Sequence, residues 1–434
     1  MIFEKKFSFV LLISIVYNTL MIFYTLMPSA AIVFSILFVF SSIYLFRRQY
    51  STFESLLLVC ILMIPTSFVS VLGTSFSQLP LTWHNLLVII MMATVVLGRK
   101  INRGYFFIFV LFLSYGLFTM FNLPFPIDAM KQLLTIELFI CSFIIADYEC
   151  SNGHSSIVNI GWECYFVGTI SVALQILLQR MVQMSIGLTL GHYGTAGVSR
   201  VLYAGLMGDY SFATLYLASG CVYALIMHLS YKKMGLFAFG MSEFLLIISM
   251  LFVSSRTGLL ALAVVVVLFF VFNLRKLNPK YLVILVIILV AFPQVAMTLM
   301  EKRGGGQALL DSSGRIENYV QALQMFTNKA FWGYGLGLDN LYSLTGLKVP
   351  HNYFVQYLVQ LGLIGTGIIT SAFLLFTKYL KKSGYYKWIF ILIVIGSMVI
   401  PDIVSSRFLS GIVILIMLTA NQDSKNFSMG EYRQ

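Results

Sequence analysis

The chain has 434 residues, of which 59% are hydrophobic and only 10% are charged. Its mean hydropathy of +0.91 excludes an ordinary soluble globular protein. Apolar runs of about 18 or more residues recur from end to end, so the sequence predicts an all-α polytopic membrane protein. The net charge of +12 does not require a nucleic-acid partner, and none is expected, because lysine and arginine first set the topology of a membrane protein.

We expect about fourteen spans, or 12–14 helices, in a single transmembrane domain over 1–434. The run that follows Lys5 and Lys6 is too long for the apolar core of a signal peptide and is expected to be a retained helix. The 387–400 run is short, and Arg407 interrupts the run after it. The predicted spans are 7–27, 30–46, 55–73, 81–98, 104–121, 130–146, 157–179, 209–229, 236–254, 257–273, 281–300, 351–376, 387–400 and 404–420.

The basic residues predict which side of the membrane each connection faces. Of the lysines and arginines, 18 fall on the N-terminal side of this map and 10 on the other side. By the positive-inside rule both termini are cytoplasmic. Two long connections, 180–208 and 301–350, are then extracytoplasmic. Within the second, apolar residues at helical spacing over 315–326 predict an amphipathic helix on the membrane surface.

Arginines on the outer side run against the topological bias, so each needs a reason. Arg256 lies between two apolar runs with almost no loop, where a cation at the membrane boundary requires an anionic partner. The alternative is an arginine that reaches lipid headgroups. Arg200 precedes Asp209, and either binds an anion or forms an ion pair that fixes the loop.

Two further arginines lie in the larger outer connection. Arg315 opens the predicted surface helix, where it is either a binding residue or an ordinary exposed residue. Arg303 precedes Gly304, Gly305 and Gly306, whose backbone N–H groups are able to approach an anion. A solvated flexible linker is the alternative for this segment.

A glycine-rich stretch, 333–337, leads to Pro350, His351 and Asn352 at the start of a late apolar run. Proline favours a helix start, which would hold His351 at the positive end of a helix dipole. That position favours a neutral imidazole able to accept a proton. A lone histidine is more often structural, but the predicted arginines lie on the same side.

The first two outer turns, near 28–29 and 74–80, contain no Asp or Glu, and the chain has no Asp-x-Asp. A site without metal or other cofactor is therefore expected, with arginines neutralising phosphate. Glu137, Glu163 and Glu243 lie inside apolar runs, where they form either a proton path or scattered buried polar contacts.

From about 195 to 370 the chain resembles the O-antigen polymerase and O-antigen ligase superfamily. The resemblance rests on Arg200 with Asp209 downstream, Ser255-Arg256-Thr257-Gly258, and Gly314-Arg315 before an amphipathic helix. It continues in 333–337, His351-Asn352 and Leu361-Gly362-Leu363-Ile364-Gly365. The first half of the chain resembles the family only in hydropathy.

The resemblance implies a glycosyltransferase of GT-C-like architecture in the bacterial cytoplasmic membrane, acting on oligosaccharides carried by undecaprenyl diphosphate. It implies that Arg200, Arg256 and Arg315 hold the diphosphate, and that His351 orients or deprotonates the acceptor hydroxyl. Arg303, Asn352 and Arg180 are further candidates for substrate binding. Arginines stabilise the leaving diphosphate without metal, and attack from the opposite face inverts the anomeric centre.

A polymerase and a ligase share these parts. Arg180 with Gly191, and Arg303 with Gly314, follow an Arg-x10-Gly pattern similar to that of some polymerases, so polymerisation of O-antigen, capsule or exopolysaccharide is favoured. A ligase that transfers glycan to lipid A–core is the alternative. A lipid-linked saccharide flippase would instead show internal repeats and broken helices. A chain-length regulator and a flippase are possible partners of a polymerase.

Overall fold

The computed structural model describes residues 7–98, 103–152, 157–191, 193–196, 200–253, 255–273 and 315–431. Its α-helices in the first half are α1 (Ser8–Leu20), α2 (Pro28–Phe46), α3 (Thr52–Leu62), α4 (Trp83–Leu97), α5 (Arg103–Met120), α6 (Pro126–Asn152) and α7 (Val158–Ile186). Those of the second half are α8 (Tyr210–Leu229), α9 (Leu236–Val253), α10 (Thr257–Asn273), α13 (Arg315–Asn328), α14 (Leu338–Thr345), α15 (Tyr353–Lys382), α16 (Lys387–Ser397) and α17 (Arg407–Glu431).

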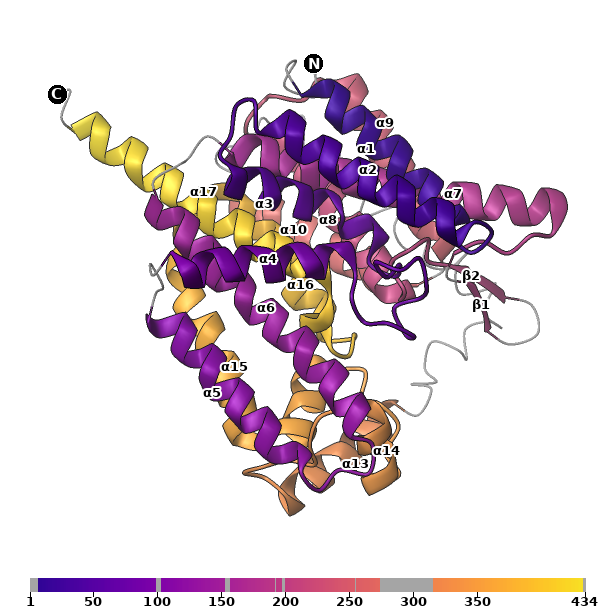
Figure 1. The fold of residues 1–434 in the computed structure, drawn as a ribbon, viewed down its shortest axis with the longest axis vertical. Coiled ribbons are helices and arrows are strands. Elements are labelled where there is room, and N and C mark those ends of the chain that lie inside the picture. The colour runs from indigo at the N-terminus through magenta and orange to yellow at the C-terminus, as the bar shows by residue number, and fades with distance from the viewer. Residues whose placement is uncertain are drawn as a thin grey trace.

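The protein is an all-α polytopic membrane protein, as predicted. Seven of the described helices are long and apolar enough to cross a membrane, and six shorter apolar helices accompany them. Among the described residues, the regular structure that is not helical is a small antiparallel hairpin, in which β1 (Tyr193–Ala196) pairs with β2 (Arg200–Tyr203). In Figure 1 this hairpin projects from the bundle beside the end of α7.

Thirteen of the fourteen predicted spans coincide with a described helix, counting α1 with the short 3-10 helix η1 (Met21–Phe23). The fourteenth, 281–300, lies outside the described residues, as does Arg303. Three differences from the predicted spans concern the neighbourhood of the candidate site: the 55–73 span ends at Leu62, the 157–179 span continues to Ile186, and the 351–376 span is interrupted at Gly362.

Burial separates central from peripheral helices. In α6, α7 and α8 about four-fifths of the apolar window is buried (78% in each), whereas in α5 and α9 only 28% is buried. A helix that is apolar all round belongs in a core or against lipid. The central helices therefore form the core of the bundle, and α2, α5 and α9 present much of their surface to the hydrocarbon.

The helix α15 is not the single uninterrupted span that 351–376 predicted. Gly362 has φ 58° and ψ −166°, so the helix breaks there into 353–361 and 363–382. The first segment folds back toward the second, and the Thr366 hydroxyl donates to the carbonyl of Tyr357 at 3.0 Å. Only the second segment runs as a membrane-spanning helix.

The break is stabilised by the turn segment 330–335, which follows α13. The N–H groups of Tyr334 and Gly335 donate to the carbonyls of Val359 and Gln360, at 2.9 and 2.8 Å. In return, Leu363 N–H donates to the carbonyl of Ala330 at 2.8 Å. Irregular backbone is tolerated at membrane depth only where protein satisfies its polar groups, and this insertion does so.

The other two boundaries differ for local reasons. Helix α3 ends at Leu62, and Pro65 lies in the 3-10 helix η2 (Ile64–Thr66) that follows, so the expected span to 73 becomes a connection over 67–82. Helix α7 continues to Ile186 and ends where Gly187 adopts a left-handed conformation. The loop expected to begin at 180 therefore begins at 187, and Arg180 lies on a helix.

Candidate functional site

Several connections meet at one end of the bundle, which we call the loop face: 67–82, 187–209, the turn before α10, 329–352 and 398–406. Hydrogen bonds join them across long sequence distances. Phe68 N–H donates to the carbonyl of Leu206 at 2.9 Å, and Lys131 donates to the carbonyl of Ser77 at 3.1 Å. In Figure 1, α13 and α14 gather beside the ends of α5 and α6. The connection 67–82 is thus joined both to Leu206 and to α6.

Arg256 lies on this face in the turn before α10. The turn is fixed because Gly258 packs against α8 so closely that a Cβ there would lie 2.3 Å from the carbonyl oxygen of Thr214. Arg256 is partly buried, and its Nε has no hydrogen-bond partner within the part of the chain that the structure describes. A buried guanidinium nitrogen without an acceptor is a position where an anion would be stabilised.

Arg180 lies on the last turns of α7, near the same turn. Its guanidinium carbon is 3.7 Å from the centroid of the Phe252 ring on α9. Phe252 is four residues before Arg256, so the two arginines approach the same end of α9. The cation–π contact leaves the charge of Arg180 in place while restricting its orientation.

Arg256 is linked to His351 through helix ends. The Ser255 and Ser211 hydroxyls are 3.4 Å apart, which joins the turn before α10 to the start of α8. Leu215 of α8 packs on Gly396, near the end of α16. The next connection, at Met398, accepts a hydrogen bond from Asn352. Arg256 and His351 therefore lie at the same end of the bundle, and we call the helix ends and turns of the loop face that connect them the rim.

His351 is exposed and precedes α15, and Tyr319 of α13 donates to its carbonyl at 2.8 Å. Asn352 is the N-cap of α15, since its Oδ1 accepts from the N–H groups of Phe354 and Val355. Its Nδ2 donates to the carbonyl of Met398 at 3.1 Å. Asn352 thus fixes the position of His351, and its predicted role in substrate binding stays a prediction.

A buried cluster of amides holds the glycine-rich stretch against the bundle. Gln132 of α6 exchanges hydrogen bonds of 3.2 Å with Gln360 of α15, and Gln356 donates to Gln360 at 3.0 Å. The backbone of Gly337 donates to Gln132 and accepts from Gln360. Gly333, Gly335 and Gly337 all have positive φ. These glycines give the loop its shape. Its polar backbone groups at Gly337 are already hydrogen-bonded to side chains of α6 and α15.

Sequence reasoning missed an acidic residue on the rim. Asp402 has a left-handed conformation in the connection between α16 and α17, and it accepts a hydrogen bond from Tyr357 at 2.5 Å. Burial raises the pKa of Asp402 to about 6, against the opposing effects of its hydrogen bonds from Tyr357 and Ser405 and of the charge of Arg407. A carboxyl group that titrates near neutral pH is suited to proton transfer. The only sequence signal was a lone aspartate after Pro401.

Arg407 was noticed as an interruption of a span but was not predicted to belong to the site. It begins α17, lies over the Phe76 ring at 4.1 Å and donates to the carbonyl of Ser405 at 3.1 Å. Its second terminal nitrogen, Nη2, is buried and has no hydrogen-bond partner among the described residues. Beside it is a small polar cleft that includes His84, Asn85 and Thr135.

Two predicted arginines are placed only by their backbone. Arg200 is the first residue of β2, and Arg315 is the first residue of α13. Nothing is described of either side chain. The structure therefore brings Arg180, Arg256, His351 and Asn352 to one rim, and the roles of Arg200, Arg303 and Arg315 stay predictions.

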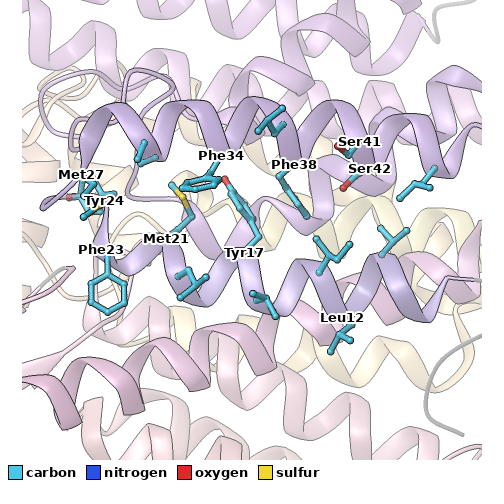
Figure 2. Close-up of a pocket in the computed structure, with 18 of the residues that line it drawn as sticks. Leu12, Tyr17, Met21, Phe23, Tyr24, Met27, Phe34, Phe38, Ser41 and Ser42 are labelled. Carbon is cyan, nitrogen blue, oxygen red and sulfur yellow. The ribbon is translucent and has the colours of Figure 1, made fainter.

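The bundle also has apolar grooves. One of them, of about 680 Å³, lies between α1 and α2. Figure 2 shows Tyr17 and Phe38 approaching one another across it, and their rings stack with centroids 4.0 Å apart. It contains none of the predicted site residues. A smaller groove of about 200 Å³ lies between α15 and α16, and its lining includes Tyr353 and Phe354, directly after Asn352.

Comparison with known proteins identifies part of the chain. Residues 241–370 match the protein-family model described as O-antigen ligase. The resemblance to the O-antigen polymerase and ligase superfamily is confirmed over this segment, which contains Arg256, His351, Asn352 and Gly362. No match is found among the curated proteins. Arg180 and Arg200 lie outside the matched segment.

Proposed function

We propose that the protein polymerises undecaprenyl-diphosphate-linked oligosaccharide repeat units into a surface polysaccharide. The reaction is a metal-independent, inverting glycosyl transfer at the outer face of the bacterial cytoplasmic membrane. The observation that supports it most is that Arg256 and His351 lie at the same end of the bundle, inside the segment that matches the O-antigen ligase family.

In this proposal the arginines bind the leaving group. A lipid diphosphate gains negative charge as the glycosidic bond breaks, and preorganised cations stabilise that charge. Arg256 offers a buried Nε without a partner among the described residues, and Arg180 stands against the same end of α9. Arg200, Arg303 and Arg315 are assigned to the same anion, as the family resemblance implies.

His351 receives the proton of the acceptor hydroxyl as that oxygen attacks the anomeric carbon. Asn352 positions His351 through its N-cap and its bond to Met398. Asp402 is fixed nearby, because it follows Met398 in the same connection and is bound by Tyr357 of α15. It is the alternative acceptor for that same proton.

A ligase that transfers the glycan to lipid A–core is the second candidate, and the description of the matching family favours it. The Arg-x10-Gly pattern favours the polymerase. In the structure its first copy brings Arg180 to the rim, while Gly191 packs against the backbone of Gly205.

The experiment is transfer by the purified protein in nanodiscs, with a lipid-linked repeat unit and EDTA, and with products separated by size. A ladder of products supports the polymerase. Products formed only when lipid A–core is added indicate the ligase. Loss of all activity on EDTA addition, restored by a divalent metal, would exclude the metal-free mechanism.

A further inference from the structure

The groove between α15 and α16 has walls of two matched helix faces. From α15 it is lined by Thr370, Leu374 and Thr377, which repeat at the spacing of one helix face. From α16 it is lined by Phe390, Val394 and Ser397, at the same kind of spacing. The floor is closed by Ile403 and by Leu409 of α17, which are both buried.

The groove is open to the hydrocarbon. Leu374 is 65% exposed, Val394 40% and Phe354 45%, although each lines the groove. Its lining is almost wholly apolar, and the threonines and serine contribute small hydroxyls. Such a surface offers a guest chain contacts along its length but no polar group that would fix a headgroup within the membrane.

One end of the groove is the rim of the candidate site. Tyr353 and Phe354 line it directly after Asn352, while Ser397 precedes Met398, which binds Asn352. Ile403 lines it directly after Asp402. The polar residues of the rim therefore lie beside one end of the apolar groove. A lipid with an anionic headgroup would bind with its headgroup at the rim and its chain in the groove.

On α15 the groove runs away from the loop face, toward the opposite end of the bundle. From Thr370 to Leu380, ten residues of helix rise about 15 Å, against a hydrocarbon core of about 30 Å. Leu380 lies two residues before Lys382, the last residue of α15. A chain bound here would lie with its head at the rim and its tail along α15 and α16.

From this arrangement we infer that the α15–α16 groove binds the polyprenyl chain of a lipid diphosphate substrate next to His351. The inference rests on the proposed function for the identity of the headgroup. The larger groove between α1 and α2 is not chosen, because none of the predicted site residues line it. An ordinary phospholipid chain is the competing occupant.

The test uses the full-length protein in nanodiscs of phosphatidylethanolamine and phosphatidylglycerol. The probe is a sugar-free polyprenyl diphosphate with a photoreactive group in its prenyl chain, and the labelled peptides are identified by mass spectrometry. We expect labelling in 370–380 and 390–397 of the wild type. Excess unlabelled polyprenyl diphosphate should remove it, and excess phosphatidylglycerol should not.

Variants separate the groove from its surroundings. Thr370→Trp and Thr377→Trp fill the groove at exposed positions and should lower labelling about tenfold, which corresponds to about 1.4 kcal/mol of binding. Leu375→Trp is the matched control, because Leu375 is exposed on the same helix but does not line the groove, so labelling should be unchanged.

Three results would overturn the inference: equal displacement by phosphatidylglycerol, labelling concentrated on α1 and α2, or labelling unaffected by both groove-filling variants. The wild-type map does not depend on any variant folding. His351→Ala distinguishes this inference from the proposed function, since it should abolish transfer while groove labelling stays at the wild-type level. Labelling without transfer in the wild type would retain the groove and reject the proposed function.

Discussion

At the scale of single residues, Arg256 is the strongest anion-binding candidate on the loop face. We expect Arg256→Ala to lower transfer by about 10²–10³-fold, the usual effect of removing a donor to developing charge. Arg256→Lys should recover only part of this, because an ammonium lacks the planar donors of guanidinium. Arg48→Ala is the matched control, since Arg48 is exposed, follows α2 and contacts Tyr44. Wild-type rates in Arg256→Ala, with normal expression, would reject the assignment.

A second prediction at this scale concerns Asp402. Its pKa of about 6 lies above the ordinary value because of burial, so the carboxyl is protonated below about pH 6 and ionised above it. If the ionised carboxylate serves transfer, the transfer rate of the wild type falls as the pH drops through about 6. The Asp402→Asn variant should lack this acidic limb of the pH–rate profile.

Tyr357→Phe provides the internal check of that prediction. The hydrogen bond from Tyr357 lowers the pKa of Asp402, so its removal should move the acidic limb to higher pH. An unchanged profile in both variants would mean that the limb belongs to another group. The effect of Asp402 on folding stability has the opposite sign to that of most aspartates. The folded state retains the carboxyl proton to higher pH than the unfolded state does, so the contribution of this group to the free energy of unfolding falls as the pH rises from about 4 to about 6.

The sequence indicated some of these residues and not others, for identifiable reasons. Arg256 and His351 were visible because a cation and an imidazole are unusual beside long apolar runs. Asp402 and Tyr357 are 45 positions apart, and only the fold joins them. Nothing in the sequence indicated that Asn352 caps α15, except that asparagine is a common N-cap residue. A sequence pattern reveals a charged or polar residue whose position beside apolar runs costs free energy. It does not reveal the hydrogen-bond partner that another helix supplies.

At the scale of elements, the break in α15 is the feature that hydropathy could not predict. Gly362 stands in an apolar run that reads as one span, and the reason for the break is the segment 330–335, which supplies the missing hydrogen bonds. Tyr115 of α5 adds bonds from its hydroxyl to the carbonyls of Trp332 and Leu361, at 2.7 and 2.5 Å. Twelve described spans followed from apolar length, whereas the break in this one required knowledge of a neighbouring segment.

We therefore predict that Gly362→Ala is strongly destabilising. The positive φ costs an L-residue about 1–3 kcal/mol, and the new Cβ would lie 2.4 Å from the carbonyl oxygen of Phe331. Gly367→Ala is the matched control, because nothing lies within 4 Å of the added Cβ and alanine favours helix by about 0.5–1 kcal/mol. Thermal unfolding in detergent should show a lower midpoint for the first variant and an equal or higher midpoint for the second. The reverse order would contradict the described break.

At the scale of the whole molecule, the proposed function of the loop face depends on which side of the membrane it faces. Arg180, Arg256, His351 and Asp402 lie there. The positive-inside rule predicts that this face is extracytoplasmic, because the other end of the bundle carries more lysine and arginine, and the proposed reaction requires its substrate on that side. If the bundle were inverted, the same residues would face cytoplasmic substrates, and the proposed reaction would be excluded.

Cysteine labelling in intact cells decides between these orientations. Gln78→Cys and Tyr342→Cys place thiols at exposed positions on the loop face, and Gln49→Cys and Lys382→Cys place them at exposed positions on the opposite end. The wild type is the background, since its cysteines are buried apart from the partly buried Cys150. A membrane-impermeant maleimide should label the first pair in intact cells and the second pair only after permeabilisation. The opposite pattern would place His351 in the cytoplasm, and a mixed pattern would show that the helices do not cross the membrane in the described order.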